Sequence, residues 1–451
     1  MIDTHAHLDF VQYDGDREKV IGECRANGVK AIVNIGVDLE TSRASIALAE
    51  KYDFIYATVG YHPHDAKDLD DNIFTEIKKL ARRPKVVAIG EIGLDYYRNL
   101  SPPEAQLKAF ARQLDLADEL NLPVVFHIRQ ALDQTYEILD KRKRHQGILH
   151  AFPGDEAEAR QGIAMGYFIA FGGPITYPKS RGPQVAASMP ISRLLTETDC
   201  PYLPPQQYRG KRNRPDYIHH VIEKLVEAYP RYSYDDIERI SEYNAARALN
   251  IKLADPPKLA YKIGRSLYIN LTARCTNNCY FCPKNTGCRV AGHNLLLSSE
   301  PTESQILEAV RKHNNYDEIV FCGLGEPTLR AELLLSLAEK FKSGQVPLRL
   351  NTNGQGSYVN KIDLPQKLAG LIDVVNVSLN APDAGTYSEI CRPQFGEMIY
   401  DEVVRFAERC RDAGLQTVLS IVDVPEIDKD ECQKLAARLG MPLKIREYAA
   451  P

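Results

Sequence analysis

The chain has 451 residues, of which 44% are hydrophobic and 26% are charged, and its formal net charge is -4. This length exceeds the roughly 250 to 300 residues at which a single core stops growing, so we expect two domains. The charge excludes a protein that holds nucleic acid through an overall basic surface. A polyanionic substrate would therefore need local basic groups or metals.

The N-terminal segment MIDTHAHLDF has no basic region followed by an apolar core, and no apolar run approaches about 18 residues. We therefore expect a cytoplasmic protein without a signal peptide or a membrane span. Its 10 cysteines would stay reduced there, which favours metal binding or redox chemistry over disulfides. Only Cys24 and Cys200 precede residue 250, whereas most histidines do, so the two halves are expected to bind different metals.

The first predicted domain covers residues 1–250. Short apolar runs alternate there with longer amphipathic stretches, a pattern typical of β/α units around a parallel sheet. Eight such runs predict a (β/α)8 TIM barrel, in which functional residues gather at the C-terminal ends of the strands. The runs are MIDTHAHL from Met1, AIVNIGV from Ala31, IYATVGYH from Ile55, VVAIGE from Val86, PVVFHI from Pro123, GILHAF from Gly147, YFIAFG from Tyr167 and LLTETD from Leu194.

The second predicted domain covers residues 263–451 and follows a linker at 251–262 that contains a proline pair. Six β/α units predict an α/β fold with an open, partial (β/α)6 barrel and sites again at the strand ends. The predicted strands are SLYINLT from Ser266, EIVFCGLG from Glu318, LRLNTNG from Leu348, VVNVSLN from Val374, LQTVLSIV from Leu415 and PLKIREY from Pro442.

Histidines and carboxylates stand at the predicted strand ends of the first domain. His5 and His7 are two residues apart on one strand, so their side chains point to the same side. Such donors can hold a pair of Mg, Mn or Zn ions, which would activate a water and clamp a phosphodiester. Any one of these histidines alone is more often a core or surface residue. The six candidate ligands are His5, His7, Glu91 as the bridging carboxylate, His127, His150 and Asp199, which could also orient or deprotonate the water.

A basic segment, YRGKRNRP, lies just beyond Asp199 in the sequence. It carries Arg209, Lys211, Arg212 and Arg214. Its position next to the predicted metal site favours binding of a nucleic-acid backbone, and a solvated charge run is the alternative.

These motifs resemble the TatD family of metal-dependent deoxyribonucleases, because DTHAHL, GYHPHDAK, GEIGLDYY, FHIR, HAFPGD and TETDCPYLPP recur in the family's order. The resemblance implies that the six residues above are metal ligands and that Glu91 and Asp199 take part in catalysis. It also implies that His62 and His64 lie near the scissile phosphate, with His62 catalytic and His64 and Arg129 binding substrate. A solvent-exposed loop pair is the alternative for the two histidines.

The sequence departs from the TatD pattern at a few positions. Arg214 stands where the family commonly has an acidic residue, and HAFPG replaces the common HCFSG. Ile128 and Gln130 flank Arg129 where small or acidic residues are usual. The ligand positions are retained.

Three cysteines follow the first predicted strand of the second domain. Cys275, Cys279 and Cys282 form C-x3-C-x2-C, which can hold three irons of a [4Fe-4S] cluster and leave one iron open for S-adenosylmethionine. A structural zinc is the alternative, with Cys288 or His293 as the fourth ligand.

Further features of this half resemble the radical S-adenosylmethionine superfamily. Phe281 matches an aromatic position near the adenine, and the CGLGEP element resembles the glycine-rich turn that receives the methionyl amino group. Two asparagines at strand ends could reach ribose or carboxylate. The resemblance implies S-adenosylmethionine binding by Phe281, Gly323, Gly325, Glu326, Asn353 and Asn380.

The two halves together predict a bifunctional enzyme, and their order resembles TatD-associated radical proteins. We expect a hydrolase that cleaves phosphodiester bonds of DNA or a related nucleotide and a radical domain that forms a 5'-deoxyadenosyl radical on an unknown substrate. The cluster would need a reductant such as flavodoxin or ferredoxin. The alternative is an amidohydrolase for a small cyclic amide with a zinc-stabilised, non-catalytic C-terminal module. Cys391, in EICRP, is a candidate reactive thiol, and the sequence predicts no particular oligomeric state.

Overall fold

The computed structural model describes residues 1–142, 146–252, 255–344 and 346–448. The chain divides into two compact units, Met1–Ala254 and Asp255–Pro451. Within the described residues, no helix is both long enough and apolar enough to cross a membrane.

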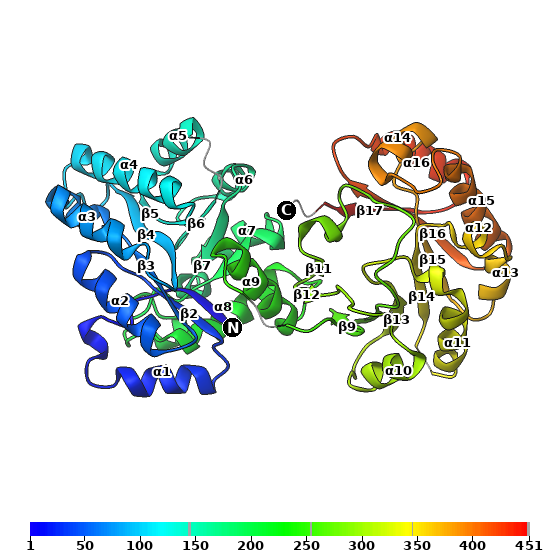
Figure 1. Ribbon diagram of the computed structural model, residues 1–451, viewed down its shortest axis with the longest axis horizontal. Coiled ribbons are helices and arrows are strands. Elements are labelled where there is room, and N and C mark those ends of the chain that lie inside the picture. The colour runs from blue at the N-terminus through cyan, green and yellow to red at the C-terminus, as the bar shows by residue number, and fades with distance from the viewer. Residues whose placement is uncertain (143–145, 253–254, 345, 449–451) are drawn as a thin grey trace. The chain divides into compact units, whose positions relative to one another are not determined.

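The first unit is a barrel of eight parallel strands that pair in chain order (Figure 1). The ring closes between its first and last strands, where His7 N donates to Cys200 O at 2.8 Å and Asp199 N donates to His5 O at 2.9 Å. All eight predicted strands and the TIM-barrel class are confirmed. The strands are β1 (Ile2–Ala6), β2 (Ala31–Asn34), β3 (Ile55–Val59), β4 (Val86–Asp95), β5 (Val124–Arg129), β6 (Gly147–Leu149), β7 (Phe168–Phe171) and β8 (Leu194–Thr196).

Helices follow the strands of this unit, and several begin at side-chain caps. Asp38, Asp155 and Ser233 each accept a backbone N–H in a capping box, which fixes the start of α2, α6 and α9. The helices are α1 (Arg17–Ala26), α2 (Leu39–Lys51), α3 (Asp71–Leu80), α4 (Pro103–Leu120), α5 (Leu132–Arg142), α6 (Glu156–Ala164), α7 (Gly182–Ala187), α8 (Ile218–Ala228) and α9 (Tyr234–Ala248). Short 3-10 turns are η1 (Val11–Tyr13), η2 (Pro63–Asp68), η3 (Gly173–Thr176), η4 (Ile191–Arg193), η5 (Gln206–Tyr208) and η6 (Pro215–Tyr217).

Two apolar layers make up the core of the first unit. One layer joins strand residues such as Ile32 and Phe126 to the surrounding helices. The other consists of alternate strand residues, including Val33, Val125 and Leu195, together with the end of α9. Successive strand side chains point to opposite faces, so this second layer fills the barrel interior. The interior is therefore packed and apolar, which leaves the strand ends for polar groups.

The second unit contains a curved seven-stranded sheet in the order β17-β16-β15-β14-β13-β10-β9. Six of these strands are parallel and coincide with the six predicted, which confirms the partial-barrel class. Strand β9 occupies the end of the segment expected to be a linker and pairs antiparallel with β10, and residues 253–254 of that segment lie outside the described residues. The strands are β9 (Ala260–Ile263), β10 (Ser266–Ile269), β13 (Glu318–Phe321), β14 (Leu348–Thr352), β15 (Val374–Ser378), β16 (Gln416–Asp423) and β17 (Leu443–Glu447), with a separate hairpin of β11 (Arg289–Val290) and β12 (His293–Asn294).

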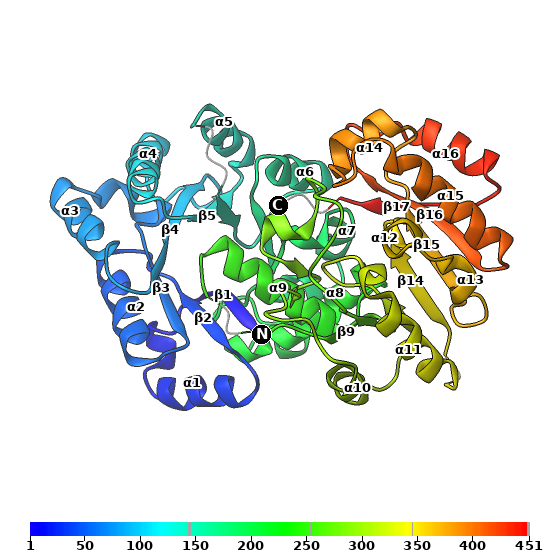
Figure 2. The ribbon, with the colours of Figure 1, turned by 45° about the vertical axis from the view of Figure 1, so that its right-hand side comes forward.

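Helices such as α15 and α16 cover one face of this sheet (Figure 2). Apolar strand residues, among them Leu350, Val377 and Leu419, pack against these helices. The alternate strand residues point to the opposite face, which is largely polar. The helices are α10 (Glu303–Arg311), α11 (Ala331–Lys342), α12 (Gly356–Asn360), α13 (Leu364–Leu368), α14 (Ala384–Cys391), α15 (Ile399–Asp412) and α16 (Lys429–Arg438), with 3-10 turns η7 (Pro283–Thr286) and η8 (Pro327–Arg330).

Candidate metal centre and cysteine loop

The six predicted ligands of the first unit come together at the C-terminal rim of the barrel. Their donor atoms form three overlapping groups, each within 4.8 Å, and Glu91 is a member of two of them. The groups are His5, His7 and Glu91; His5, His150 and Asp199; and Glu91, His127 and His150.

The two carboxylate oxygens of Glu91 face different ligands. Its Oε2 lies 3.3 Å from His5 Nε2, and His5 Nε2 lies 3.2 Å from His7 Nε2. Its Oε1 lies 2.8 Å from His127 Nδ1 and 3.7 Å from His150 Nε2. One carboxylate therefore joins two donor sets, the arrangement that a bridging ligand between two cations requires.

Some imidazole nitrogens of the candidate ligands are buried and have no protein partner. Among the described residues, His5 Nδ1 and His7 Nδ1 are buried and have no hydrogen-bond partner. Burial favours the neutral form of Glu91, but His5, His150 and His127 outweigh it and hold the pKa of this carboxyl well below its usual range. An anionic carboxylate among buried imidazoles is a suitable donor set for divalent cations, so the residues fit a metal pair.

Local backbone features place Asp199 and His127. Asp199 adopts φ 56°, and its Oδ1 lies 3.5 Å from His7 Nε2. Aspartate tolerates this left-handed conformation better than most residues. Gly93 on β4 has φ 149°, and a Cβ atom there would lie 2.0 Å from His127 O, so only glycine lets β4 approach β5 beside this ligand.

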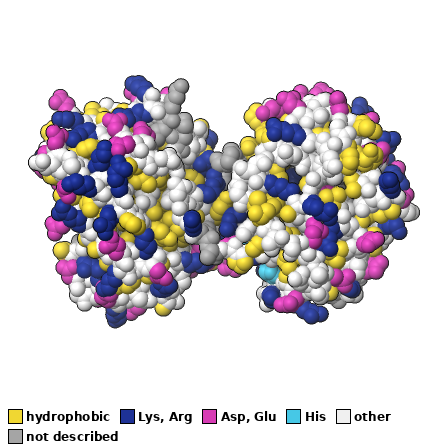
Figure 3. All heavy atoms as spheres, in the orientation of Figure 1, with side chains coloured by type: hydrophobic (Ala, Val, Ile, Leu, Met, Phe, Trp, Pro, Cys, Tyr) yellow, Lys and Arg dark blue, Asp and Glu magenta, His cyan; other side chains and the backbone are white. Residues whose placement is uncertain are grey.

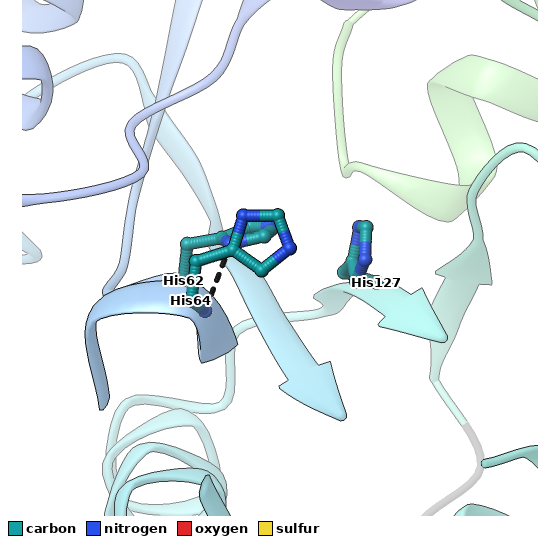
Figure 4. A group of neighbouring side chains, drawn as sticks. All are labelled: His62, His64 and His127. Atoms are coloured by element: carbon teal, nitrogen blue, oxygen red, sulfur yellow. Dashed lines mark hydrogen bonds between the residues drawn. The ribbon is translucent and has the colours of Figure 1, made fainter. Parts of the chain in front are cut away.

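His62 and His64 lie on the loop after β3, close to His127 (Figure 4). His62 Nδ1 accepts the His64 backbone N–H at 3.1 Å, so a neutral His62 ring carries its proton on Nε2, which lies 3.8 Å from Glu91 Oε1. Burial lowers the pKa of His62 well below its usual value and keeps the ring neutral. The structure thus brings both predicted loop histidines next to the candidate metal ligands, with His62 as a hydrogen-bond donor.

Asp95 supports two of these histidines and was not identified from the sequence. Its fully buried Oδ2 lies 2.8 Å from His64 Nε2 and 3.0 Å from His127 Nε2, and its Oδ1 accepts the Arg98 backbone N–H. Burial opposes protonation of His127, but hydrogen bonds to Asp95 and Glu91 raise its pKa to about 9. The only sequence signal was its place in GEIGLDYY, four residues after Glu91.

Glu197 supports His150 in the same way. Its fully buried Oε1 accepts the Ala151 backbone N–H at 2.7 Å, and its Oε2 lies 3.0 Å from His150 Nδ1. His150 Nε2 then faces Glu91. The sequence signal for this residue was the acidic position two residues before Asp199 in TETD.

The predicted basic groups have different surroundings. Arg129 is exposed and lies 3.9 Å over the Tyr97 ring, and Arg209 and Lys211 are exposed on the loop after β8. Arg212 instead forms a two-point ion pair with Asp16, so its guanidinium is engaged within the protein. Arg214, the departure from the family pattern, pairs with Glu23 and Asp216.

Basic and acidic side chains are interspersed on the face of the first unit that Figure 3 shows. That face carries no broad field of one sign, in keeping with the small net charge. Attraction of a polyanion therefore depends on the local groups at the rim.

The cysteine loop of the second unit follows β10 and is fixed by backbone hydrogen bonds. Asn278 N donates to Cys391 O at 2.9 Å, and Tyr280 N donates to Ile390 O at 3.2 Å, which docks the loop on the end of α14. The neighbouring Cys391 thiol and burial raise the pKa of the Cys279 thiol. Cys275, Cys279 and Cys282 are all partly exposed.

The glycine-rich element after β13 packs against the segment that leads into this loop. A Cβ atom on Gly323 would lie 2.0 Å from Asn270 Oδ1, and one on Gly325 would lie 2.2 Å from Arg274 O. Both positions therefore require glycine. The buried carboxylate of Glu326 accepts the backbone N–H groups of Thr328 and Asn353 at 3.0 and 2.6 Å.

The remaining predicted residues of this site also lie around the loop. Asn353 Nδ2 donates to Thr276 Oγ1 at 2.8 Å and lies 3.9 Å from Cys275 Sγ. Asn380 Nδ2 lies 3.6 Å from Cys391 Sγ, and its buried Oδ1 has no partner among the described residues. Phe281 is half-buried and packs against Tyr280.

A zinc site and an iron-sulfur cluster require different spacings of the cysteine sulfurs. A tetrahedral zinc with Zn–S bonds of about 2.3 Å holds its sulfurs about 3.8 Å apart. Within the described part of the chain, no three cysteine sulfurs lie within 4.8 Å of one another. His293 Nε2 lies 2.9 Å from Lys262 O, not beside the loop. Three thiolates that each bind a different iron need no such close approach.

The polar face of the second sheet carries several buried groups below the loop. Arg349 forms a two-point ion pair with Glu318 at 2.7 and 3.0 Å. Arg446 donates to Ser378 Oγ at 3.1 Å, and no ion pair joins it to a described carboxylate. Its Nε has no partner among those residues, and the same holds for Asn376 Oδ1 and Ser420 Oγ, which are buried on this face.

A closed eight-stranded barrel whose rim gathers histidines around a shared carboxylate defines the first unit as a metal-dependent hydrolase. The chain belongs to the TatD related DNase family, whose model matches residues 2–250.

Relatives match the same region. The chain is 41% identical over 254 residues to the uncharacterized metal-dependent hydrolase YabD of Bacillus subtilis. This match covers 56% of this chain and 99% of the relative. It is 37% identical over 268 residues to the 3'-5' ssDNA/RNA exonuclease TatD of Cronobacter sakazakii, and this match covers 57% of this chain and 100% of the relative. The crystal structure of YJJV, a TatD homolog from Escherichia coli K12, superposes with a TM-score of 0.54 and 33% identity over 56% of this chain and 98% of its own.

Residues 269–439 match the Radical SAM superfamily. This match identifies the second domain as enzymatic and so decides against the non-catalytic zinc module. The chain therefore combines a metal-dependent hydrolase domain with a radical S-adenosylmethionine domain, and both are enzymatic. Divalent metals, an iron-sulfur cluster and S-adenosylmethionine are the cofactors that these two families imply.

Proposed function

We propose that the first domain is a two-metal phosphodiesterase that removes nucleotides from single-stranded DNA. The observation that carries this proposal is the geometry of the Glu91 carboxylate. Its two oxygens, Oε1 and Oε2, face separate sets of possible metal ligands. A metal pair bound there supplies an activated water and neutralises charge on a phosphodiester during in-line displacement. The exonuclease name of the Cronobacter relative supports single-stranded nucleic acid as the substrate.

The chain's own residues have distinct parts in this proposal. His5, His7, Glu91, His127, His150 and Asp199 would hold the metal pair, and Glu91 is the member that faces two of the donor sets. Asp199 also accepts the proton of the attacking water.

The neutral His62 ring offers its Nε2–H to a non-bridging phosphate oxygen, because its Nδ1 is already occupied by the His64 backbone N–H. Exposed Arg129, Arg209 and Lys211 attract the nucleic-acid backbone.

Release of mononucleotides from a single-stranded oligodeoxynucleotide tests the proposal. Loss of a residue that supports a metal ligand usually lowers activity by about 10- to 100-fold. Glu91→Gln removes a bridging ligand itself, so we expect it to lower the rate of nucleotide release by more than about 100-fold. Glu137→Gln, an exposed position on α5, is the matched control. Wild-type protein that hydrolyses a cyclic amide but no oligonucleotide would replace this proposal with the amidohydrolase alternative.

For the second domain, we propose that Cys275, Cys279 and Cys282 hold a [4Fe-4S] cluster. Such a cluster with bound S-adenosylmethionine supplies a 5'-deoxyadenosyl radical on reduction, and flavodoxin or ferredoxin is the kind of donor it needs. The element from Gly323 to Glu326, with Phe281, Asn353 and Asn380, surrounds the loop and would bind S-adenosylmethionine. The docking of the loop on α14 and the superfamily match support this assignment.

Anaerobic reconstitution with iron and sulfide tests this second assignment. We expect wild type to bind iron and acid-labile sulfide and, when reduced with S-adenosylmethionine, to form 5'-deoxyadenosine. Cys279→Ala should lose both properties, whereas Cys410→Ala, on the buried face of α15, should keep them. Zinc without sulfide in the wild-type protein would contradict the assignment.

A further inference from the structure

Exposed apolar side chains of the first unit are concentrated at the metal-bearing rim. Every large exposed hydrophobic residue in the described part of this unit lies on a loop that follows β1, β4 or β8. Such residues scattered singly over a surface need no explanation, but their confinement to one rim indicates a ligand surface. They are Val11, Tyr97, Leu100, Tyr202 and Leu203.

Tyr202 is connected directly to one side of the metal centre. Its backbone N–H donates to Asp199 O at 2.9 Å. The residue is 48% exposed, its ring meets the Phe10 ring edge-on at 6.0 Å, and Phe10 stacks on His7 at 4.5 Å. An exposed aromatic face is thus held close to the ligands His7 and Asp199.

Tyr97 has the equivalent place on the other side. Its backbone N–H donates to Asp95 Oδ1 at 3.0 Å, and Asp95 contacts His127. The residue is 58% exposed, and the Arg129 guanidinium lies 3.9 Å from the centre of its ring.

Barrel topology places these two tyrosines opposite each other. In a ring of eight strands paired in chain order, β8 and β4 are four strands apart, the largest separation possible. Tyr202 follows β8 and Tyr97 follows β4. The candidate metal ligands therefore lie between two exposed aromatic residues. Arg129 lies over the Tyr97 ring, and the loop that carries Tyr202 also carries the exposed Arg209 and Lys211.

We propose that Tyr97 and Tyr202 stack on the nucleobases on either side of the scissile phosphate and so select single-stranded substrates with intact bases. This inference rests on the proposed nuclease function. Aromatic rings bind any base through its face, while neighbouring cations bind the phosphates. Bases in a duplex are already stacked and paired, so only a single strand can present them to both rings.

Binding of two fluorescein-labelled strands tests the proposal. One strand is oligodeoxythymidylate, and the other has the same length with abasic tetrahydrofuran nucleotides. Dissociation constants are measured by fluorescence anisotropy with the full-length Glu91→Gln protein, so that the strand stays uncut. We expect Tyr97→Ala and Tyr202→Ala each to weaken binding of the thymidylate strand by about 5-fold or more.

The controls define the result that would overturn the proposal. Tyr97→Phe and Tyr202→Phe should bind as tightly as the parent, because the ring is retained. Tyr358→Ala, exposed in the second unit, should also leave binding unchanged. The abasic strand should bind weakly to every variant alike. Equal weakening of both strands by the alanine variants, or of neither, would show that the tyrosines do not recognise bases.

Cleavage by the unmutated enzyme separates this inference from the function on which it rests. Base-dependent binding without any cleavage would reject the nuclease proposal and keep the stacking site. Cleavage of abasic and thymidylate strands at the same rate would keep the nuclease and reject the stacking site.

Discussion

The two barrels of this chain differ in what fills them. The first is closed, and its inward-facing layer is apolar, with Val33, Val125 and Leu195 among its members. The second is open, and the corresponding face of its sheet carries the Arg349–Glu318 pair and the Arg446 guanidinium. A closed, packed barrel can place functional groups only at its rim, whereas an open one can also place them along its strands.

The largest expected effect tests whether the two sites are independent. Cys282→Ala should abolish iron and sulfide binding after anaerobic reconstitution, because the cluster loses a ligand. Release of nucleotides from single-stranded DNA should stay within about 2-fold of wild type, since each unit has its own core. A parallel loss of nuclease activity would show that the two sites depend on each other.

The next largest effect concerns Asp95, which supports two rim histidines at once. Asp95→Asn places an amide where a carboxylate accepts two imidazole N–H groups. We expect nuclease activity to fall by about 100-fold and divalent metal to dissociate more readily, the range for loss of a ligand's support. Metal retained after dialysis and the rate are the two measurements, with the exposed Asp133→Asn as control.

Glu197 gives a smaller effect because it supports one histidine. Glu197→Gln keeps an oxygen for the Ala151 backbone N–H but can turn its amide N–H toward His150. We expect an activity loss of about 10-fold. If Glu197→Gln proved as harmful as Glu91→Gln, Glu197 would have to act on the substrate or metal directly.

The smallest effect tests the polar interior of the second barrel. Arg349→Met leaves the half-buried Glu318 without its cation and should lower the free energy of unfolding by about 3 kcal/mol. Arg446→Met removes a guanidinium that has no carboxylate partner among the described residues. We therefore expect the free energy of unfolding to fall by less than about 1 kcal/mol or to rise. Hydrogen exchange of the backbone amides in β14 and β17 measures the free energy of unfolding of both variants. Equal losses of stability in the two variants would contradict the expected difference.

The strands and the main ligands could be predicted from the sequence for a clear physical reason. Every predicted strand was an apolar run that the structure confirms. His127 lies near the end of β5, and His150 directly follows β6. In a parallel barrel the ends of the strands meet, so the position along the chain predicts proximity in space. The antiparallel strand β9 was missed because its residues were read as a proline-containing linker.

The supporting residues could not be found in this way. Asp95 and Glu197 act through histidines that are distant in the sequence, so their role depends on side-chain directions that no periodicity encodes. Arg212 was expected to face the substrate, but Asp16, also distant in the sequence, engages it. A charge near a site in sequence does not reveal which partner in the fold it will meet.

The anchoring of the cysteine loop on α14 has an entropic consequence for assembly of the second site. Ordering a flexible segment costs roughly 1 to 2 kcal/mol per residue, and in small zinc domains the metal must supply that free energy. Here backbone hydrogen bonds from Asn278 and Tyr280 hold the loop against the end of the helix. Less of the cluster's binding free energy is then needed to immobilise the chain, which favours repeated loss and rebuilding of the cluster without unfolding of the domain.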